Sequence, residues 1–197
     1  MLTYEEALAR VLAAMPSPKA ERISVAEAAG RFLAEAVASP LDLPPFDNSA
    51  MDGYAVRAED VAAASADRPV TLRVLGQVGA GEVFSGAVGA QTCVRLFTGT
   101  PLPRGADAVV MQEDTRTTDA QPDEVQILDR ARPWENVRLR GEDVKSGKVI
   151  ALPGTRLGAG HLNLLAAVGT ASVRVARRPS GPPCPAWRSG WAVGHGG

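Results

Sequence analysis

Near the N-terminus, apolar residues recur at helical spacing. From Tyr4 to Met15 an apolar side chain returns every three or four residues, which places these side chains on one face of a helix. Thr3 and Glu6 have the spacing of a capping box, a hydroxyl followed three residues later by a carboxylate. The pattern therefore predicts a helix that begins after Thr3 and ends before Pro16.

A short helix and a strand are predicted next. Ser24 and Glu27 repeat the capping-box spacing, and Gly30 supplies a C-terminal stop after little more than one turn. From Arg31 to Ala38 apolar and polar residues alternate in part, which favours a strand.

From about residue 50 to residue 139 the pattern changes to short apolar runs separated by clusters of Gly, Pro and Asp. Runs of this length without a helical stripe indicate the strands of a small antiparallel β unit. The predicted strands are Tyr54–Val56, Val70–Leu75, Cys93–Phe97, Ala108–Met111 and Val125–Leu128. The polar segment from Asp119 to Glu124 predicts an exposed loop.

After Arg140 the chain returns to the texture of its first 45 residues. A short apolar run at Val149–Leu152 precedes a helical stripe over Leu157–Val168 and an alternating strand over Ala171–Ala176. This order predicts one domain made from both ends of the chain, with the β unit inserted between them. Residues 180–197 are rich in Pro and Gly and show no periodicity, so we expect a disordered tail.

Composition and charge limit the classes of function. The chain is 45% hydrophobic and 22% charged, as is ordinary for a globular protein. A formal net charge of -1 and 5% aromatic residues provide neither a basic surface nor stacking platforms for nucleic acid. Cys93 and Cys184 are far apart and form no CxxC site. Because the N-terminus is acidic and no apolar run reaches the roughly 18 residues of a membrane helix, we expect a cytoplasmic protein.

The stretch Pro44–Val56 separates the first helical segment from the β unit. Its two prolines fix φ and remove two backbone donors, so neither a helix nor a central strand passes through them. Asp47, Asn48 and Ser49 carry short side chains that hydrogen-bond their own backbone in turns. The stretch is either a rigid ligand-binding loop or a proline-ended turn into a hairpin, and the local pattern leaves both readings open.

Several carboxylates near turns offer oxygen ligands for a hard cation. Mg²⁺ takes one or two carboxylates and completes its shell with phosphate oxygens and water. The alternative is that these carboxylates are solvated surface groups. The candidates are Asp47, Asp52, Glu113, Asp114, Glu142 and Asp143.

Two further stretches have features of an oxyanion site. Thr98-Gly99-Thr100 ends a predicted strand with two hydroxyls around a glycine, which suits either an oxyanion or a strand-terminating turn. Arg138, Arg140 and Lys145 surround the segment Gly141–Asp143. These cations either meet a phosphate-like group or pair with the adjacent acids.

Four stretches, in this order, resemble the molybdopterin molybdotransferase family, which includes MoeA-like proteins and the E domain of gephyrin. Each stretch is short, but the combination is specific, and it covers about Leu2 to Pro179. The stretches are Pro44–Val56, Thr98–Pro103 with Gly105–Glu113, Arg140–Val144, and Gly154–Leu157 through Arg178-Pro179.

The resemblance implies a fold and an activity. The expected fold class is α+β and mostly β, similar to the MoeA N-terminal region. An elongated helix/strand domain would comprise residues 1–46 and 140–179, used for dimerisation in the family, with a small antiparallel β domain inserted over 47–139. The family acts in molybdenum cofactor biosynthesis. It inserts molybdenum from molybdate into adenylylated molybdopterin with Mg²⁺ assistance and releases AMP, as a homodimer.

The resemblance also implies roles for individual residues. A carboxylate can orient Mg²⁺ or water at a pyrophosphate bond, and a hydroxyl can hold an oxyanion. The implied catalytic residues are Asp52, Thr98 and Asp143, with Asp52 also a Mg²⁺ ligand. The implied substrate-binding residues are Arg138, Asn48, Ser49 and Glu142.

The end of the chain departs from the family's pattern. After the position of Pro179 the family continues into an α/β domain that carries the pterin-binding surface and completes the active site of the dimer partner. Residues 180–197 do not match that domain. We therefore expect a truncated N-terminal fragment with a tail from a shifted reading frame, inactive by itself. The alternative function is a non-catalytic dimerisation or binding scaffold.

Overall fold

A computed structural model describes residues 2–15, 17–79, 81–118 and 120–178. Over these residues the chain is mostly β, and it divides into two units. One unit combines the residues up to Val37 with those from Val149 onward, and the other spans Ala38–Lys148. The predicted division into a domain of residues 1–46 and 140–179 with an insertion over 47–139 stays a prediction. The predicted disorder of residues 180–197 lies outside the described residues.

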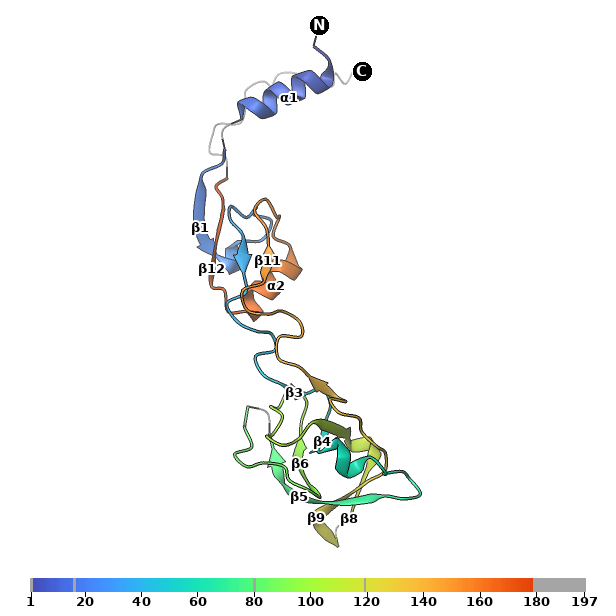
Figure 1. Cartoon of the computed structure of the whole chain (residues 1–197). Helices are drawn as coiled ribbons and strands as arrows, with labels where there is room; N and C mark the ends of the chain where they lie inside the picture. Colours follow the sequence, from blue (N-terminus) through green and yellow to red (C-terminus); the bar gives the residue numbers. More distant parts are fainter. Residues whose placement is uncertain (1, 16, 80, 119, 179–197) are drawn as a thin grey trace, which may run out of the picture. The chain divides into compact units, whose positions relative to one another are not determined.

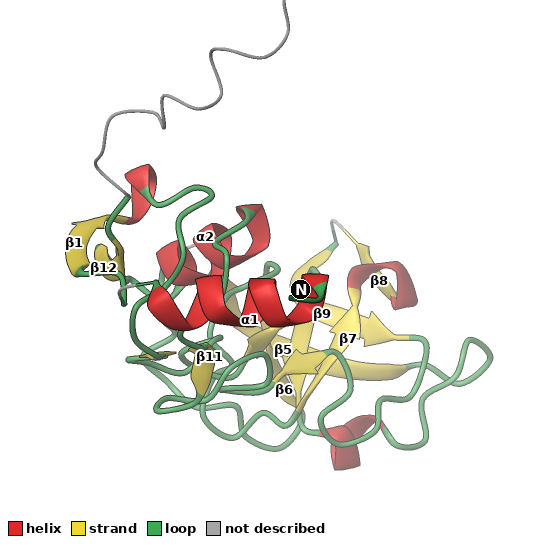
Figure 2. Cartoon of the chain, turned by 90° about the horizontal axis from the view of Figure 1, so that it is seen from above, coloured by secondary structure: helices red, strands yellow, loops and turns green. Residues whose placement is uncertain are grey.

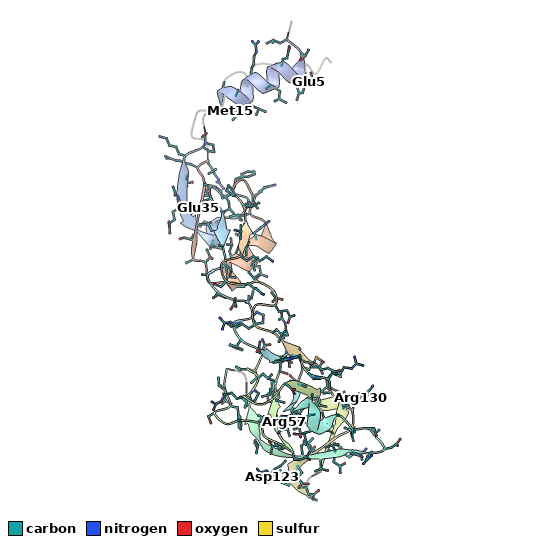
Figure 3. The ribbon with its side chains drawn as sticks, viewed as in Figure 1. Glu5, Met15, Glu35, Arg57, Asp123 and Arg130 are labelled. Atoms are coloured by element: carbon teal, nitrogen blue, oxygen red, sulfur yellow. The ribbon has the colours of Figure 1, made fainter. Side chains whose placement is uncertain are left out.

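Helix α1, Tyr4–Ala14, begins where the capping box predicts. The amide of Glu6 donates to the hydroxyl of Thr3 at 3.2 Å, and the amide of Thr3 donates to the Glu6 carboxylate at 2.9 Å. The large apolar side chains of α1 are nevertheless exposed, from Tyr4 at 76% to Leu8 at 43%, and Figure 3 draws the side chains of this helix as sticks. Within the described residues, neither α1 nor α2 has the length and apolar content that crossing a lipid bilayer requires.

The first unit is built from segments at both ends of the chain. Its elements are β1 (Ala20–Ser24), the 3-10 helix η1 (Val25–Glu27), β2 (Val37–Ala38), β11 (Val149–Ala151), α2 (Ala159–Ala167) and β12 (Ser172–Ala176). Strand β1 pairs antiparallel with β12, and β2 pairs with β11. The core of this unit consists of Val25, Ala28, Leu33, Ala151, Leu157, Leu165, Val173 and Val175.

One prediction for this unit needs correction, and one strand was missed. The strand predicted over Arg31–Ala38 is reduced to β2, because Phe32 and Leu33 form only isolated bridges before the chain turns. Strand β1 was not predicted, since only Ile23 in it is a large apolar residue. Its partner β12 alternates clearly, and β1 forms because β12 lies beside it.

The second unit contains a sheet of six described strands in the order β7-β4-β6-β5-β9-β8 (Figures 1 and 2). Five of these strands were predicted. Neighbouring strands are antiparallel except β5 and β6, which are parallel. The bounds are β4 Gly53–Val56, β5 Val70–Val78, β6 Thr92–Leu96, β7 Ala108–Met111, β8 Thr115–Thr118 and β9 Gln121–Ile127. This unit also contains two 3-10 helices, η2 (Ala58–Val61) and η3 (Gln112–Asp114).

The exposed loop predicted over 119–124 is wrong for most of its length. Strand β9 begins at Gln121 and forms a hairpin with β8, in which Thr118 pairs with Gln121. These residues are polar because β8 is an edge strand and the start of β9 is exposed. An apolar alternation, which is the usual signal for a strand, is therefore absent there.

Strand β4 lies between β6 and β7 and is buried on both faces. Tyr54 and Val56 enter one hydrophobic core, whereas Ala55 enters the core on the opposite face. At Gly53 a Cβ atom would lie 2.0 Å from the carbonyl oxygen of Val110 on β7, so only glycine allows this approach. The residue immediately before β4 is thus held at the end of the most buried strand.

Candidate functional site

The loop of residues 44–52, which leads into β4, is joined by main-chain hydrogen bonds to two other segments. Its strand β3 (Asn48–Ser49) pairs antiparallel with β10 (Val137–Arg138). On the other side the amide of Gly99 donates to the Ser49 carbonyl at 2.8 Å, and the Ser49 amide donates to the Thr100 carbonyl at 3.0 Å. The loop therefore lies between the two stretches that carry the other candidate residues.

Asn48 and Ser49 direct their side chains into the loop itself. Asn48 is 6% exposed and donates through Nδ2 to the Phe46 carbonyl at 3.1 Å. Ser49 is fully buried, and its hydroxyl donates to the carbonyl of Met51. Both side chains hold the loop in shape, and the substrate-binding roles implied for them stay a prediction.

Asp52 and Thr98, 46 residues apart in the sequence, form one pair in the structure. The Oδ1 atom of Asp52 accepts two hydrogen bonds of 2.8 Å, one from the amide and one from the hydroxyl of Thr98. These two bonds, amide first, and the nearby cation of Arg95 lower the pKa of the Asp52 carboxyl below its ordinary value. Among the described residues Oδ2 accepts no hydrogen bond. Asp52 is thus an ionised carboxylate whose Oδ2 atom has no hydrogen-bond partner in the described part of the chain.

The direction of the Thr98 hydroxyl bond restricts what this group can do. A threonine hydroxyl has one proton, and here it is donated to Asp52. While that bond is kept, the hydroxyl cannot also donate to a bound oxyanion. The geometry therefore makes Thr98 an orienting group for Asp52.

The oxygen donors at Asp52 suit a Mg²⁺ ion that is bound partly by substrate, rather than one that is bound by protein ligands alone. No cluster of three or more potential metal ligands occurs among the described residues. Mg²⁺ commonly takes only one or two carboxylates and obtains its other ligands from substrate phosphates and water. The free Oδ2 of Asp52 fits such a site as its single protein ligand.

Arg138, Glu142 and Asp143 form a second group. The Nη2 atom of Arg138 donates to both carboxylate oxygens of Asp143 at 2.7 Å, and Nε lies 3.8 Å from Glu142. The hydrogen bond to Asp143 raises the pKa of Arg138, which keeps the guanidinium charged. Glu142 also accepts from the amide of Leu139 at 2.9 Å, which closes the turn. The site residues thus fall into two groups, with the loop of residues 44–52 between them.

Asp42 supports the second group and was not singled out in the sequence. One of its oxygens accepts from the amide of Ser146 at 2.8 Å, and the other accepts from Nε of Arg140 at 2.6 Å. The bond from Ser146 first, and then that from Arg140, lowers the pKa of the Asp42 carboxyl. Asp47 holds the same turn, because its carboxylate accepts from the amide of Arg140 at 2.7 Å. No local pattern marks Asp42, since its partners lie about 100 residues away.

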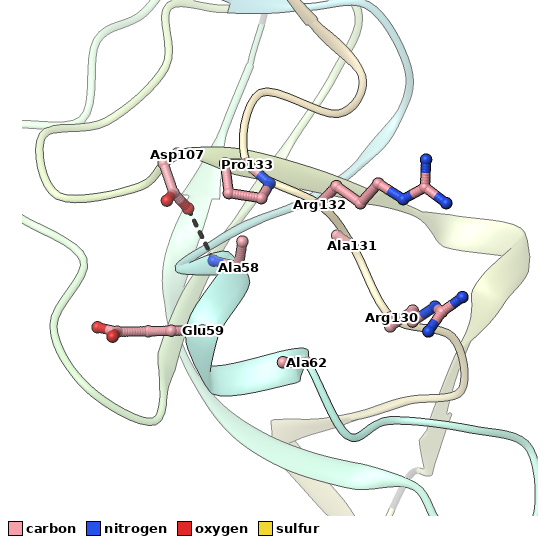
Figure 4. A pocket seen from close by; sticks show the side chains of 8 residues that line it. All are labelled: Ala58, Glu59, Ala62, Asp107, Arg130, Ala131, Arg132 and Pro133. Atoms are coloured by element: carbon pink, nitrogen blue, oxygen red, sulfur yellow. Dashed lines mark hydrogen bonds between the residues drawn. The ribbon is translucent and has the colours of Figure 1, made fainter.

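The remaining candidates lie outside both groups. Glu113 and Asp114 belong to η3, and neither is paired with a candidate in the described part of the chain. A hollow of about 610 Å³ also lies apart from the two groups (Figure 4). Its lining residues are Ala58, Glu59, Ala62, Asp107, Arg130, Ala131, Arg132 and Pro133. Figure 4 shows Asp107 accepting from the amide of Ala58, a bond of 2.7 Å, while the two arginines and Glu59 extend in opposite directions.

Comparison with known proteins finds relatives of this chain. Residues 2–169 match the family described as the MoeA N-terminal region (domain I and II). The chain is 39% identical over 179 residues to the molybdopterin molybdenumtransferase of Haemophilus influenzae, covering 90% of this chain and 43% of that protein. It is also 39% identical over 179 residues to the Bacillus subtilis protein of the same name, covering 90% of this chain and 42% of the relative.

A solved structure shares the fold. The crystal structure of the molybdopterin biosynthesis moeA protein from Pyrococcus horikoshii matches with a TM-score of 0.85 and 37% identity, over 91% of this chain and 47% of that one. The chain therefore spans less than half the length of the relatives that it matches.

Proposed function

The chain belongs to the family of the MoeA N-terminal region, and from this premise we propose that it serves molybdenum cofactor biosynthesis. In this proposal it supplies one wall of the site at which molybdenum passes from molybdate into adenylylated molybdopterin, with release of AMP. The names of the relatives support the transfer of molybdenum to molybdopterin. The hydrogen-bonded pair of Asp52 and Thr98 is the observation that supports placing this reaction at the candidate site.

We assign Asp52 to binding and orientation rather than to proton abstraction. A general base works best when its pKa lies near the working pH, whereas the pKa of Asp52 is held below its ordinary value. The free Oδ2 can direct a water molecule, or bind Mg²⁺ shared with substrate phosphate oxygens. When bound, that ion would neutralise part of the phosphate charge. The two hydrogen bonds from Thr98 keep the Asp52 carboxylate ionised and fix its orientation.

Arg138 is proposed to bind the anionic substrate, with Asp143 as its positioning partner. Asp143 engages only Nη2, and Glu142 lies near Nε, so the N–H groups of Nη1 have no partner among the described residues. A guanidinium held in this way presents donors to a phosphate at little further cost in side-chain entropy. Asn48 and Ser49 contribute by shaping the loop between Asp52 and Arg138.

The rest of the site is proposed to come from parts of the relatives that this chain does not match. We propose that the protein is a cytoplasmic homodimer in which a partner subunit completes the cleft, and that this chain is inactive alone. A non-catalytic dimerisation scaffold is the second candidate. The exposed apolar side chains of α1 favour it, because such a face is suited to another protein surface.

The test is a chimera in which residues 2–169 of this chain replace the matching region of the Bacillus subtilis relative. We expect molybdate-dependent AMP release from adenylylated molybdopterin, together with metal transfer. Asp52→Asn should abolish both, whereas Asp123→Asn on the exposed start of β9 should leave them unchanged. A folded chimera without activity, or full activity in Asp52→Asn, would contradict the catalytic proposal.

A further inference from the structure

Arg95 is a half-buried cation beside the candidate site that none of the sequence motifs singled out. It lies on β6, opposite Tyr54 of β4. Its Nη1 donates to the Tyr54 hydroxyl at 3.0 Å, and its Nη2 donates to Oε1 of Gln112 at 2.8 Å. Its guanidinium carbon lies 5.3 Å from the centre of the Tyr54 ring and 5.7 Å from that of Phe97. Four contacts with three side chains fix its position.

Neutral groups supply all of these contacts. Among the described residues no carboxylate oxygen lies within 4.0 Å of the Arg95 guanidinium, although Arg31, Arg57, Arg138, Arg140 and Arg174 each have an acidic partner. A guanidinium carries five N–H donors, and Arg95 uses two of them on Tyr54 and Gln112. It therefore retains both its charge and spare donors.

The frame that holds Arg95 also holds Asp52. The amide of Gln112 donates to the Asp52 carbonyl at 3.0 Å, while the side chain of the same residue holds Arg95. Gln112 thus joins the two groups through hydrogen bonds of its main chain and of its side chain. In the described part of the chain Asp52 and Arg95 form no ion pair within 4.0 Å, and the Oδ1 atom of Asp52 is bonded to Thr98 instead.

This arrangement supplies what the Asp52–Thr98 pair lacks. A carboxylate repels an anionic group, and the only hydroxyl proton of the pair is already donated. A rigid guanidinium next to it offers planar donors that match the oxygens of a tetrahedral oxyanion. Little side-chain entropy remains to be lost on binding, because Tyr54, Phe97 and Gln112 have already ordered Arg95.

We propose that Arg95 is a binding residue for a tetrahedral oxyanion at the Asp52–Thr98 pair, where it bonds one or two oxygens of a phosphate or a free oxyanion. The proposal rests on the proposed function only in taking this pair as part of the active site. Its predicted binding does not depend on catalysis, so the two can be tested separately.

The test uses the full chain with three probes, AMP, inorganic phosphate and molybdate, each titrated by calorimetry and by amide NMR shifts. We expect at least one probe to bind and to shift the amide of Thr98. Arg95→Gln should weaken that binding about tenfold or more, as for loss of a charge-assisted hydrogen bond, and Arg95→Lys should give an intermediate loss. AMP as the stronger ligand points to a nucleotide-linked phosphate, and molybdate as the stronger ligand points to the free oxyanion.

Two controls separate binding from folding. Arg73→Gln removes an exposed arginine from the adjacent strand β5 and should leave binding unchanged. Gln112→Ala keeps the charge but releases Nη2, and it should weaken binding less than Arg95→Gln does. Absence of binding for all three probes, or equal binding by a folded Arg95→Gln variant, would overturn the inference. If an oxyanion binds and binding depends on Arg95, but the chimera is inactive, the inference about Arg95 stands and the proposed reaction does not.

Discussion

Replacing Gly53 by alanine should destabilise the sheet of the second unit and disturb the position of Asp52. The added Cβ would lie 2.0 Å from the carbonyl oxygen of Val110 and 3.1 Å from the Cα of Met111. Carbon–oxygen contacts in proteins begin at about 3.3 Å, so β4 and β7 must separate by roughly 1.3 Å at this point. Because the obstacle is backbone, no rotation of a side chain relieves the clash.

The size of the effect follows from the ladder that this separation disturbs. Gly53 is paired with Met111, and Tyr54 with Val110, in the antiparallel pairing of β4 with β7. Loss of one or two ladder hydrogen bonds costs about 1 kcal/mol each, and strain from overpacking adds about 1–3 kcal/mol. The sum is about 2–5 kcal/mol. For a chain of this length it corresponds to a fall in Tm on the order of 5–20 °C.

Thermal and urea unfolding followed by circular dichroism would measure this loss. Gly89→Ala is the matched control, since its Cβ would meet only the Thr92 hydroxyl at 3.9 Å. That variant should stay within about 0.5 kcal/mol of the wild type. If Gly53→Ala melts together with Gly89→Ala, then β4 does not approach β7 as closely as described, and the support of Asp52 by this strand is wrong.

Four further outcomes are expected. Thr98→Val should raise the pKa of Asp52 toward its ordinary value in an NMR titration of the carboxyl carbons, and an unchanged pKa would remove the hydroxyl from this role. Because the pKa of Asp52 is lowered in the folded state, its ionised carboxylate stabilises the fold at pH values above the ordinary pKa of an aspartate. This contribution is lost as the pH falls through the pKa of the folded state. Asp52→Asn should therefore reduce the dependence of the unfolding free energy on pH in the acidic range. Burial raises the pKa of the Cys93 thiol from 9.0 to about 12. Stability from this group is therefore present below pH 9 and declines above it, and the wild type should lose about 1–2 kcal/mol more than Cys93→Ala between pH 8 and pH 10.5; parallel curves would contradict this. Asp42→Ala should speed hydrogen exchange at the Ser146 amide, and equal protection in both proteins would show that this bond does not hold the turn.

The sequence predicts those parts of the fold whose signal is local. Strands β4 to β7 were found because each is a run of apolar residues, and α1 because its capping box lies beside an apolar stripe. The edge or exposed strands β1 and β8 were not predicted, because their mostly polar sequences show no alternation of apolar and polar residues. Their positions depend on the partner strand rather than on their own residues.

The candidate site was predictable as a set of residues but not as an arrangement. Asp52 and Thr98 were both named through the resemblance, yet their contact depends on the register that pairs Gly53 with Leu96. The register between two strands cannot be predicted from a single sequence when both faces of a strand are buried, because no apolar–polar alternation distinguishes one face from the other. Arg95 escaped for a related reason, because only that register places it beside Tyr54.

The loop of residues 44–52 affects which amino-acid substitutions this site can accept during evolution. Several of its links to the neighbouring segments run through the main chain, from Ser49 to Gly99 and Thr100 and from β3 to β10. Hydrogen bonds of this kind do not depend on which side chains the linked residues carry. The main-chain frame should therefore tolerate a change of side chain better than the side-chain contact between Thr98 and Asp52 does. Drift should accumulate at exposed residues such as Phe46 before it reaches the buried pair Asn48 and Ser49.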